Sequence, residues 1–190
     1  MFGFNKKKKD ETSQPAPVVT SRFTFVPLGF HGDLYLMKVV DVIGKHVVFF
    51  AETGTNVGST LSYFAKKYPS VKCVSCEPNP EAFELAQKNA GGANVELFNE
   101  MSQEFLERLK RNYSNELSKP SAYWLDAHGY GFDWPLIHEM QFIMTYAKEY
   151  YILIDDFEVP GIPEFGFDVY QNQVCSHDYI KSHLPDQEFY

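Results

Sequence analysis

Short apolar, β-prone runs alternate with amphipathic segments along most of the chain. Five such runs are predicted as strands, at 46–52, 71–77, 94–98, 121–128 and 150–156. Apolar positions three and four residues apart predict helices near 33–44 and over 58–68, 79–92, 102–113 and 133–149. Strands that alternate with helices form parallel βαβ units with right-handed crossovers. The pattern therefore predicts a doubly wound α/β fold with a mainly parallel sheet.

The two ends of the chain depart from this alternation. Residues 1–17 are polar and include a run of lysines, so we expect a flexible tail ahead of a single domain spanning 18–190. Residues 157–190 are rich in aromatic residues, proline and glycine, and their pattern predicts no particular element. A chain of 190 residues is long enough for one domain with a sizeable core and too short for two.

Composition narrows the range of functions. The hydrophobic content of 44% excludes a wholly disordered chain, and the formal net charge of -8 argues against a nucleic-acid-binding surface over the whole protein. No apolar run approaches the roughly 18 residues of a membrane span, and the N-terminus has no apolar segment typical of a secretory signal. We therefore expect a cytoplasmic protein that acts on a small molecule, without nucleic-acid or membrane partners.

Two of the cysteines have a spacing typical of redox or zinc motifs. Cys73 and Cys76, however, fall within a predicted strand, and residues three apart on a strand point to opposite faces of the sheet. Their thiols should therefore not meet, and both are predicted to be ordinary core residues.

Every predicted strand ends in a carboxylate or beside one. The side chains in question are Glu52, Glu77, Asn99 with Glu100, Asp126 with His128, and Asp155 with Asp156. The carboxyl ends of parallel strands lie at the same edge of a sheet, where ligands bind in open α/β folds. Any single polar residue at a strand end is commonly just solvated, but five such ends together predict a binding site.

The segment ETGTNVGST, residues 52–60, is the strongest local motif. A phosphate-binding P-loop would need a lysine after its second glycine, and none follows here. A dinucleotide fingerprint G-x-G-x-x-G would need three glycines, two of which are replaced, although Glu77 lies at a suitable sequence distance for a ribose contact. The third interpretation is an acid, Glu52, that closes the strand and precedes G-x-N-x-G, with Gly54 at the turn and Gly58 at the start of the helix.

This third pattern resembles the first motif of class I S-adenosylmethionine-dependent methyltransferases. The resemblance implies that Glu52 and the loop of Gly54, Asn56 and Gly58 receive the amino-acid part of the cofactor. A carboxylate suits the ammonium group of S-adenosylmethionine, whereas it would repel a pyrophosphate.

The segment CEPNPEAFELAQKN, residues 76–89, resembles the second motif of the FkbM-type methyltransferases. There the acid accepts hydrogen bonds from both ribose hydroxyls, a role that the resemblance gives to Glu77, since a carboxylate can accept two parallel hydrogen bonds. The resemblance covers residues 46–100. In this fold the adenine ring lies after the third strand, which implies that Met101 and Ser102 border it.

Later motifs resemble a different branch of the methyltransferases. WLDAHG and ILIDDF are similar to segments of the sugar and macrolide O-methyltransferases related to the macrocin enzyme. The resemblance implies a magnesium ion held by Asp126, Asp155 and Asp156, whose oxygen atoms suit Mg²⁺. Asp126 is also expected to contribute to cofactor binding and catalysis, and His128 to act as a general base or a further ligand.

Three further residues are weaker candidates. The segment GFHGD, residues 29–33, precedes the first predicted helix and would close over the cofactor, with His31 reaching the substrate. Tyr130 and Trp134 lie in the loop after the fourth strand and would form a wall of the acceptor site. Each of these residues is equally well explained by an ordinary role in a loop or in packing.

The sequence thus predicts a Rossmann-like methyltransferase that transfers a methyl group to an oxygen of a sugar or another small hydroxylated acceptor, with magnesium assistance. An NAD-type oxidoreductase and a non-catalytic binding module that retains the fold are the alternatives. Methyltransferase sheets of this class continue beyond the fifth strand, so we expect the chain to be either a fragment truncated at its C-terminus or a minimal form of the fold. A fifth strand without its outer neighbour leaves self-association open.

Overall fold

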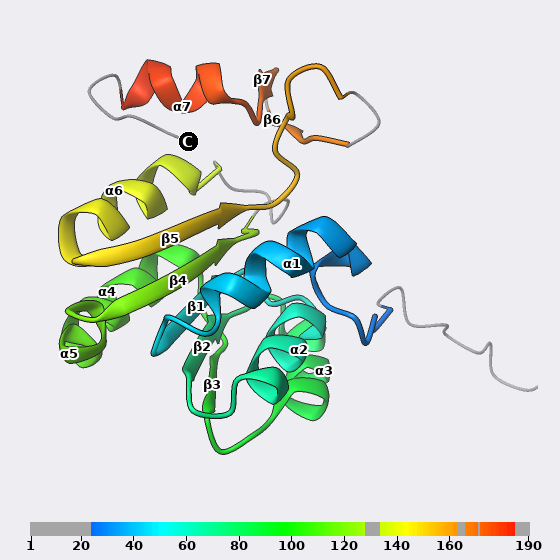
Figure 1. Ribbon diagram of the computed structural model, residues 1–190, viewed down its shortest axis with the longest axis vertical. Helices are drawn as coiled ribbons and strands as arrows, with labels where there is room; N and C mark the ends of the chain where they lie inside the picture. The colour runs from blue at the N-terminus through cyan, green and yellow to red at the C-terminus, as the bar shows by residue number, and fades with distance from the viewer. Residues whose placement is uncertain (1–23, 128–133, 163–165, 171, 185–190) are drawn as a thin grey trace, which may run out of the picture.

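The computed structural model describes residues 24–127, 134–162, 166–170 and 172–184 (Figure 1). Its central sheet has five strands: β1 Phe49–Thr53, β2 Lys72–Cys76, β3 Val95–Phe98, β4 Pro120–Leu125 and β5 Glu149–Ile154. All neighbours are parallel and the strand order is β3-β2-β1-β4-β5. The predicted doubly wound α/β fold is therefore confirmed. Residues 1–17 lie outside the described part of the chain.

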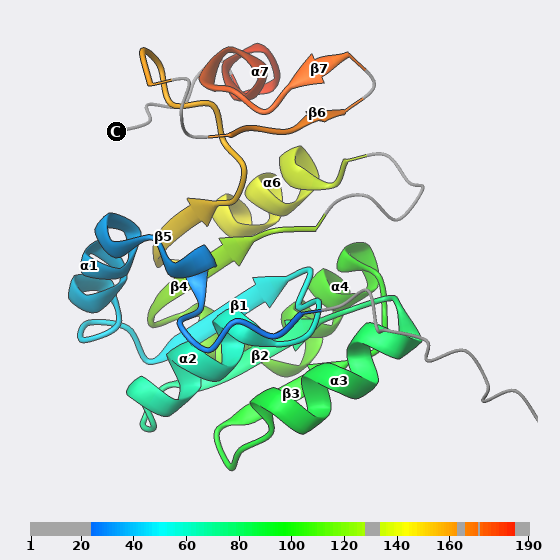
Figure 2. The same ribbon diagram turned by 90° about the vertical axis from the view of Figure 1, so that its right-hand side faces the viewer.

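Helices cover both faces of this sheet (Figure 2). One face carries α1 Leu34–Ile43, α2 Ser59–Lys67 and α3 Pro80–Ala90. The other face carries α4 Ser102–Asn112, the short α5 Ser114–Leu117 and α6 Leu136–Tyr146. Two of these helices, α1 and α3, start at a side-chain cap. Asp33 accepts hydrogen bonds from the first backbone N–H groups of α1, and Asn79 does the same for α3 ahead of Pro80.

The two faces bury separate hydrophobic clusters. β1 is buried along its whole length and supplies Phe49 to one cluster and Phe50 to the other. The cysteine prediction is confirmed in the same way, because Cys73 and Cys76 are both buried and belong to opposite clusters. Alternate side chains of a central strand point to opposite faces, so this burial requires the helices on both sides.

The strand order places a switch point between β1 and β4. From β1 the chain builds outward through β2 to β3, and it then returns to the other side of β1 to begin β4 and β5. The loops that follow β1 and β4 therefore diverge in opposite directions from adjacent strand ends. In open α/β sheets this is the position at which ligands bind.

The segment after β5, which the sequence left without a prediction, forms a small separate unit. It contains a hairpin of β6 Val169–Tyr170 and β7 Gln173–Val174, followed by α7 His177–His183. Ile180 and Leu184 join the hydrophobic cluster of α4 and α6, and the ring of Tyr179 stacks on Trp134 at 5.0 Å. The hairpin belongs to its own two-stranded sheet, so β5 is an edge of the central sheet among the described residues.

The exposure of β5 agrees with this edge position. Tyr150 and Tyr151 are 36% and 38% exposed, whereas β1 at the centre of the sheet is buried along its whole length. Within the described ranges, no helix combines the length and apolar character needed to cross a membrane.

The β5 edge predicts self-association that depends on protein concentration, because an unpaired strand offers backbone hydrogen-bonding groups to a second chain. Tyr151→Lys should shift the equilibrium toward monomer by placing a charge beside this edge. Sedimentation velocity over a range of concentrations measures the effect. Val169→Lys, at an exposed position of the β6–β7 hairpin, is the matched control and should leave the distribution unchanged. A wild-type chain that remains monomeric at all concentrations would contradict this prediction.

Candidate functional site

The turn after β1 is built from residues in left-handed backbone conformations. Gly54, Asn56 and Gly58 have φ angles of 79°, 50° and 81°. At Gly54 there is no space for a side chain, since a Cβ atom would overlap the backbone carbonyl oxygen of Asp126. At Gly58 a Cβ atom would lie 3.0 Å from that of Ala90 in α3. The sequence motif is thus explained by a tight turn and by two close approaches.

Backbone hydrogen bonds tie this turn to its neighbours. The N–H groups of Gly54 and Thr55 both donate to the carbonyl oxygen of Cys76, at 3.1 and 3.0 Å. The N–H of Asp126 donates to the carbonyl oxygen of Thr53 at 3.0 Å. The ends of β1, β2 and β4 are therefore fixed relative to one another, and the side chains that follow them have defined positions.

Glu52 is the penultimate residue of β1 and is buried. Its side chain is only 1% exposed, and one carboxylate oxygen accepts a hydrogen bond from the Ser75 hydroxyl at 2.7 Å. Burial raises the pKa of Glu52 well above its usual value, and the nearby charges of Asp126 and Glu77 raise it further. A bound cation beside this carboxylate would reverse that effect and favour its ionised form.

Glu77 connects the loop after β2 to the loop after β1. Its two carboxylate oxygens accept hydrogen bonds from the backbone N–H of Asn56 at 2.7 Å and of Asn79 at 2.8 Å. Burial raises the pKa of Glu77, and these two hydrogen bonds oppose the rise. Each oxygen can accept a second hydrogen bond, so the carboxylate keeps accepting capacity beyond these two donors.

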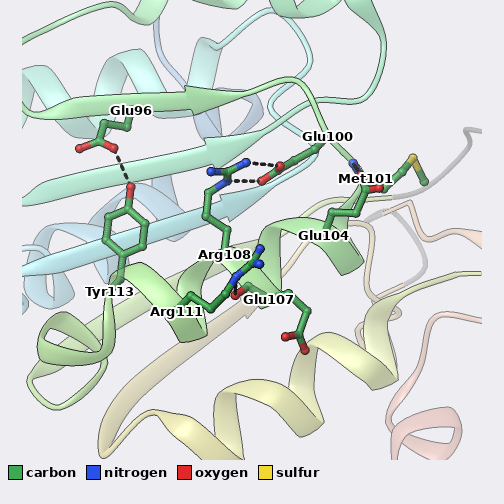
Figure 3. A network of polar contacts seen from close by, with 8 residues as sticks. All are labelled: Glu96, Glu100, Met101, Glu104, Glu107, Arg108, Arg111 and Tyr113. Carbon is green, nitrogen blue, oxygen red and sulfur yellow. Dashed lines mark hydrogen bonds and ion pairs between the residues drawn. The ribbon is translucent and has the colours of Figure 1, made fainter.

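The loop after β3 is held by a polar network on α4 (Figure 3). The guanidinium of Arg108 donates two hydrogen bonds to the carboxylate of Glu100, each 2.7 Å long, and lies over the ring of Phe98. The N–H of Met101 donates to the Glu104 carboxylate at 3.1 Å. Paired guanidinium–carboxylate contacts fix orientation as well as distance. Met101 and Ser102 are therefore held at the strand end where the sequence placed them.

Glu139 is a buried acid that the sequence analysis missed. It lies on α6, 1% exposed, and its carboxylate accepts a hydrogen bond from the Ser102 hydroxyl. Burial raises the pKa of Glu139 to about 7, although the hydrogen bond from Ser102 opposes the rise. The available signal was a single acid among apolar residues of a helix, which on its own is typical of a solvated position.

A second group of polar side chains lies at the ends of β4 and β5. The Nε2 atom of His31 is 2.8 Å from an Oδ atom of Asp155, although the two residues are far apart in sequence. Asp126 joins them, and one ligand atom from each of the three lies within 4.8 Å of the others. The sequence predicted Asp126 and Asp155 for a metal site and His31 for the substrate side, and the structure brings all three together.

Asp156, the third metal ligand expected from the sequence, is not one of the three clustered residues. It has a φ angle of 47°, and its carbonyl oxygen accepts a hydrogen bond from the N–H of Asp168. His128 and Tyr130 lie outside the described residues. Trp134 is described, and one face of its ring is occupied by the stacked Tyr179.

The cluster is electrostatically coupled. The hydrogen bond to Asp155 raises the pKa of His31 to about 9, and the charges of Asp155, Asp126 and Asp156 add to the rise against partial burial. Burial would raise the pKa of Asp155, but the hydrogen bond and charge of His31 outweigh it and lower that pKa. A cation at His31 thus compensates two adjacent carboxylates.

The expected magnesium ion fits this donor set only in part. The carboxylates of Asp126 and Asp155 are suitable oxygen ligands for a divalent cation. The third member of the cluster is the imidazole of His31, and nitrogen is a poor ligand for Mg²⁺. The three clustered residues therefore differ from the all-oxygen set of Asp126, Asp155 and Asp156 that the sequence led us to expect.

Of the comparisons with known proteins, only the one with solved structures gives matches. No protein-family model matches the chain, and no curated protein sequence does either. The O-methyltransferase TomG from Streptomyces achromogenes, solved in complex with SAM and involved in tomaymycin synthesis, aligns with a TM-score of 0.52 and 17% identity over 64% of this chain and 53% of TomG. The chain is thus similar to the Rossmann-like fold of a methyltransferase.

Other O-methyltransferase structures align less closely. One from Bacillus cereus, in complex with SAH, gives a TM-score of 0.48 and 17% identity over 60% of this chain and 50% of that one. A putative O-methyltransferase from Klebsiella pneumoniae gives 0.46 and 20% identity, over 60% of this chain and 49% of that one. The chain spans about half the length of each of these structures.

Gly54→Ala should destabilise the protein strongly, because the added methyl group would overlap the Asp126 carbonyl in a backbone conformation that already disfavours alanine. We expect a loss of about 3 kcal/mol or more in the free energy of unfolding. Gly161→Ala is the matched control, since Gly161 has a similar φ angle of 80° and no atom within 4 Å of the position that a Cβ atom would take. It should cost only about 1 kcal/mol, measured by urea unfolding. Equal losses would contradict the proposed overlap.

Because the pKa of Glu139 is raised in the folded state, the free energy of unfolding should fall as pH rises. Its folded-state pKa of about 7 exceeds the usual 4.5, so between these values the folded state keeps a proton that the unfolded state has released. Relative to Glu139→Gln, which has no such proton, the wild type should lose about 3 kcal/mol in the free energy of unfolding between about pH 4 and pH 8. Urea unfolding across this range measures the difference.

The control for this experiment is Glu84→Gln, at an exposed position of α3. Its unfolding free energy should follow that of the wild type at every pH. If Glu139→Gln also runs parallel to the wild type, the Glu139 carboxyl does not retain its proton in the folded state.

Proposed function

We propose that the chain binds S-adenosylmethionine at the ends of β1, β2 and β3 and transfers its methyl group to an oxygen of a small hydroxylated acceptor. The observation that carries this proposal is the position of Glu77, whose carboxylate clamps the glycine-containing turn and keeps accepting capacity on both oxygens. The likeness of the fold to that of TomG, a structure in complex with SAM, supports it.

The cofactor would be bound in three parts. The turn of Gly54, Asn56 and Gly58 lets the amino-acid part approach the backbone, and Glu52 supplies negative charge for its ammonium group. The ribose hydroxyls would donate to Glu77. The adenine would lie against the loop of Met101 and Ser102, which Glu104 and Glu139 hold in place.

The chemistry requires mainly positioning of the acceptor. An oxygen of the acceptor attacks the methyl carbon in line with the carbon–sulfur bond, whose electron pair goes to sulfur as S-adenosylhomocysteine leaves. The hydroxyl proton passes to a base, for which His128 and Asp126 are our candidates. In this proposal the acidic strand ends favour the positively charged sulfonium cofactor over its product, which lacks the sulfonium charge.

The alternative of an NAD-type oxidoreductase is disfavoured by the same geometry. In a dinucleotide site the backbone N–H groups of the glycine turn bind the pyrophosphate. Here the N–H of Asn56 already donates to the Glu77 carboxylate, so it is not available to a pyrophosphate and a carboxylate lies beside it. A pyrophosphate at this turn would be repelled.

Turnover, rather than binding, distinguishes a methyltransferase from a non-catalytic binding module. A module would bind S-adenosylmethionine and S-adenosylhomocysteine without producing the second from the first. Incubation with a panel of sugars, catechols and other hydroxylated acceptors, followed by mass spectrometry, distinguishes the two.

Calorimetric titration should show binding of S-adenosylhomocysteine, and Glu77→Ala should weaken it by about 1.5–3 kcal/mol, the range of hydrogen bonds to charged groups. Glu81→Ala, an exposed acid in the first turn of α3, is the matched control and should bind as the wild type does. Binding of NAD with no response to S-adenosylmethionine or its product would refute the proposal.

A further inference from the structure

His31 is carried by a loop in an unusual backbone conformation. Gly29, Phe30, His31 and Gly32 have consecutive positive φ angles of 61°, 42°, 52° and 75°. Non-glycine residues rarely adopt this region, and they remain there only when the surrounding structure fixes them. The loop stands close to the ends of β4 and β5, ahead of α1 (Figures 1 and 2).

The surroundings fix this loop at several points. The ring of Phe30 is fully buried and meets Trp124 edge to face at 5.0 Å, while its N–H donates to the Thr60 hydroxyl at 3.0 Å. At Gly29 a Cβ atom would lie 2.7 Å from the Cβ of Tyr63, so the backbone is pressed against α2. The place of His31 is therefore set by the fold around Phe30 and does not depend on its ion pair alone.

The imidazole is held over two carboxylates. The side chain of Asp155 is only 10% exposed, whereas that of His31 is 67% exposed, so His31 stands between Asp155 and solvent. Asp126 follows β4 directly beside Asp155, as the pairing of Leu125 with Ile154 requires. Two carboxylates from adjacent strands and one imidazole from the N-terminal loop thus converge, with their ligand atoms within 4.8 Å.

We infer that His31, Asp126 and Asp155 form a binding site for a first-row transition-metal dication such as Zn²⁺ or Co²⁺. One imidazole nitrogen and two carboxylate oxygens are a mixed donor set that such ions accept well, whereas Mg²⁺ prefers oxygen ligands and nearly regular octahedral geometry. Three protein ligands leave coordination positions for water or for an oxygen of a substrate.

This inference goes beyond the proposed function and can fail independently of it. The site lies on the β4 and β5 side of the switch point, while Glu52 and Glu77 lie on the β1 and β2 side. Metal binding needs no bound cofactor, and cofactor binding needs no metal. A direct metal titration of the full chain is therefore the appropriate test.

The first experiment is calorimetric titration of chelator-treated, dialysed protein with Zn²⁺ and, separately, with Mg²⁺. We expect one Zn²⁺ per chain, with an affinity at least about tenfold higher than that for Mg²⁺. Titration with Co²⁺ adds a structural readout, since a directly coordinated imidazole gives paramagnetically shifted proton resonances.

Variants distinguish metal coordination by His31 from a simple ion pair between His31 and Asp155. His31→Ala should weaken Zn²⁺ binding by about 10- to 100-fold or more and remove the shifted imidazole resonances. His31→Gln retains a hydrogen-bond donor for Asp155 but lacks the imidazole nitrogen, and it should behave like His31→Ala. Asp155→Asn should abolish binding. His46→Ala, at an exposed position ahead of β1, is the matched control and should bind as the wild type does.

Three results would overturn the inference. They are equal affinities for Zn²⁺ and Mg²⁺, Zn²⁺ binding that is unaffected by His31→Ala, and no saturable Zn²⁺ binding at all. In the last case His31 is only the ion-pair partner of Asp155. A cooperative urea-unfolding transition, measured on the same samples, confirms that each variant is folded. A sample that binds Zn²⁺ but not S-adenosylhomocysteine would count against the proposed function and leave the metal site standing.

Discussion

The close approach of Gly54 to the carbonyl group of Asp126 is the constraint on which the site depends. It allows the loops after β1 and β4 to touch at the switch point of the sheet, where a side chain of any size would separate them. The backbone hydrogen bonds from Gly54 and Thr55 to Cys76, and from Asp126 to Thr53, depend on the same approach. Three strand ends are thereby fixed within hydrogen-bonding distance of one another.

Crowding of carboxylates is the direct consequence of this constraint. Glu52 and Glu77 come from β1 and β2, while Asp126 and Asp155 come from β4 and β5, and the pKa of Glu52 is raised by burial and then by the charges of the other three. Such an arrangement lowers stability unless cations or hydrogen-bond donors compensate it. His31 provides a cation on one side, and the backbone N–H groups of Asn56 and Asn79 provide donors on the other. The remaining accepting capacity of these carboxylates is the basis for our proposal of a cationic ligand.

The sequence predicted the sheet and its main helices because each depends on a local apolar pattern. β1 and β2 are almost wholly buried and form short β-prone runs, and apolar positions recur every three to four residues in the helices around them. The β6–β7 hairpin and α7 could not be predicted in the same way. Strands of two residues such as Val169–Tyr170 carry no period, and α7 is held by contacts with distant residues. The same contrast holds for the site. Gly54 and Glu77 belong to short sequence motifs that can be recognised locally. The contact of His31 with Asp155 joins residues far apart in the sequence, and no local motif predicts it.

The fold alone does not determine the chemistry, since the same α/β architecture serves dinucleotides and sulfonium cofactors. What distinguishes the two at this switch point is the sign of the charge around the turn. A pyrophosphate site leaves the backbone N–H groups of the glycine turn free for the phosphates, whereas here the N–H of Asn56 donates to the Glu77 carboxylate. Since β1 and β4 are adjacent, the acids at their ends lie at the same edge of the sheet. In our proposals a sulfonium cofactor lies on the β1 side and a metal dication on the β4 side, and Asp126 belongs to both sites because its backbone touches the turn at Gly54 while its carboxylate joins His31 and Asp155.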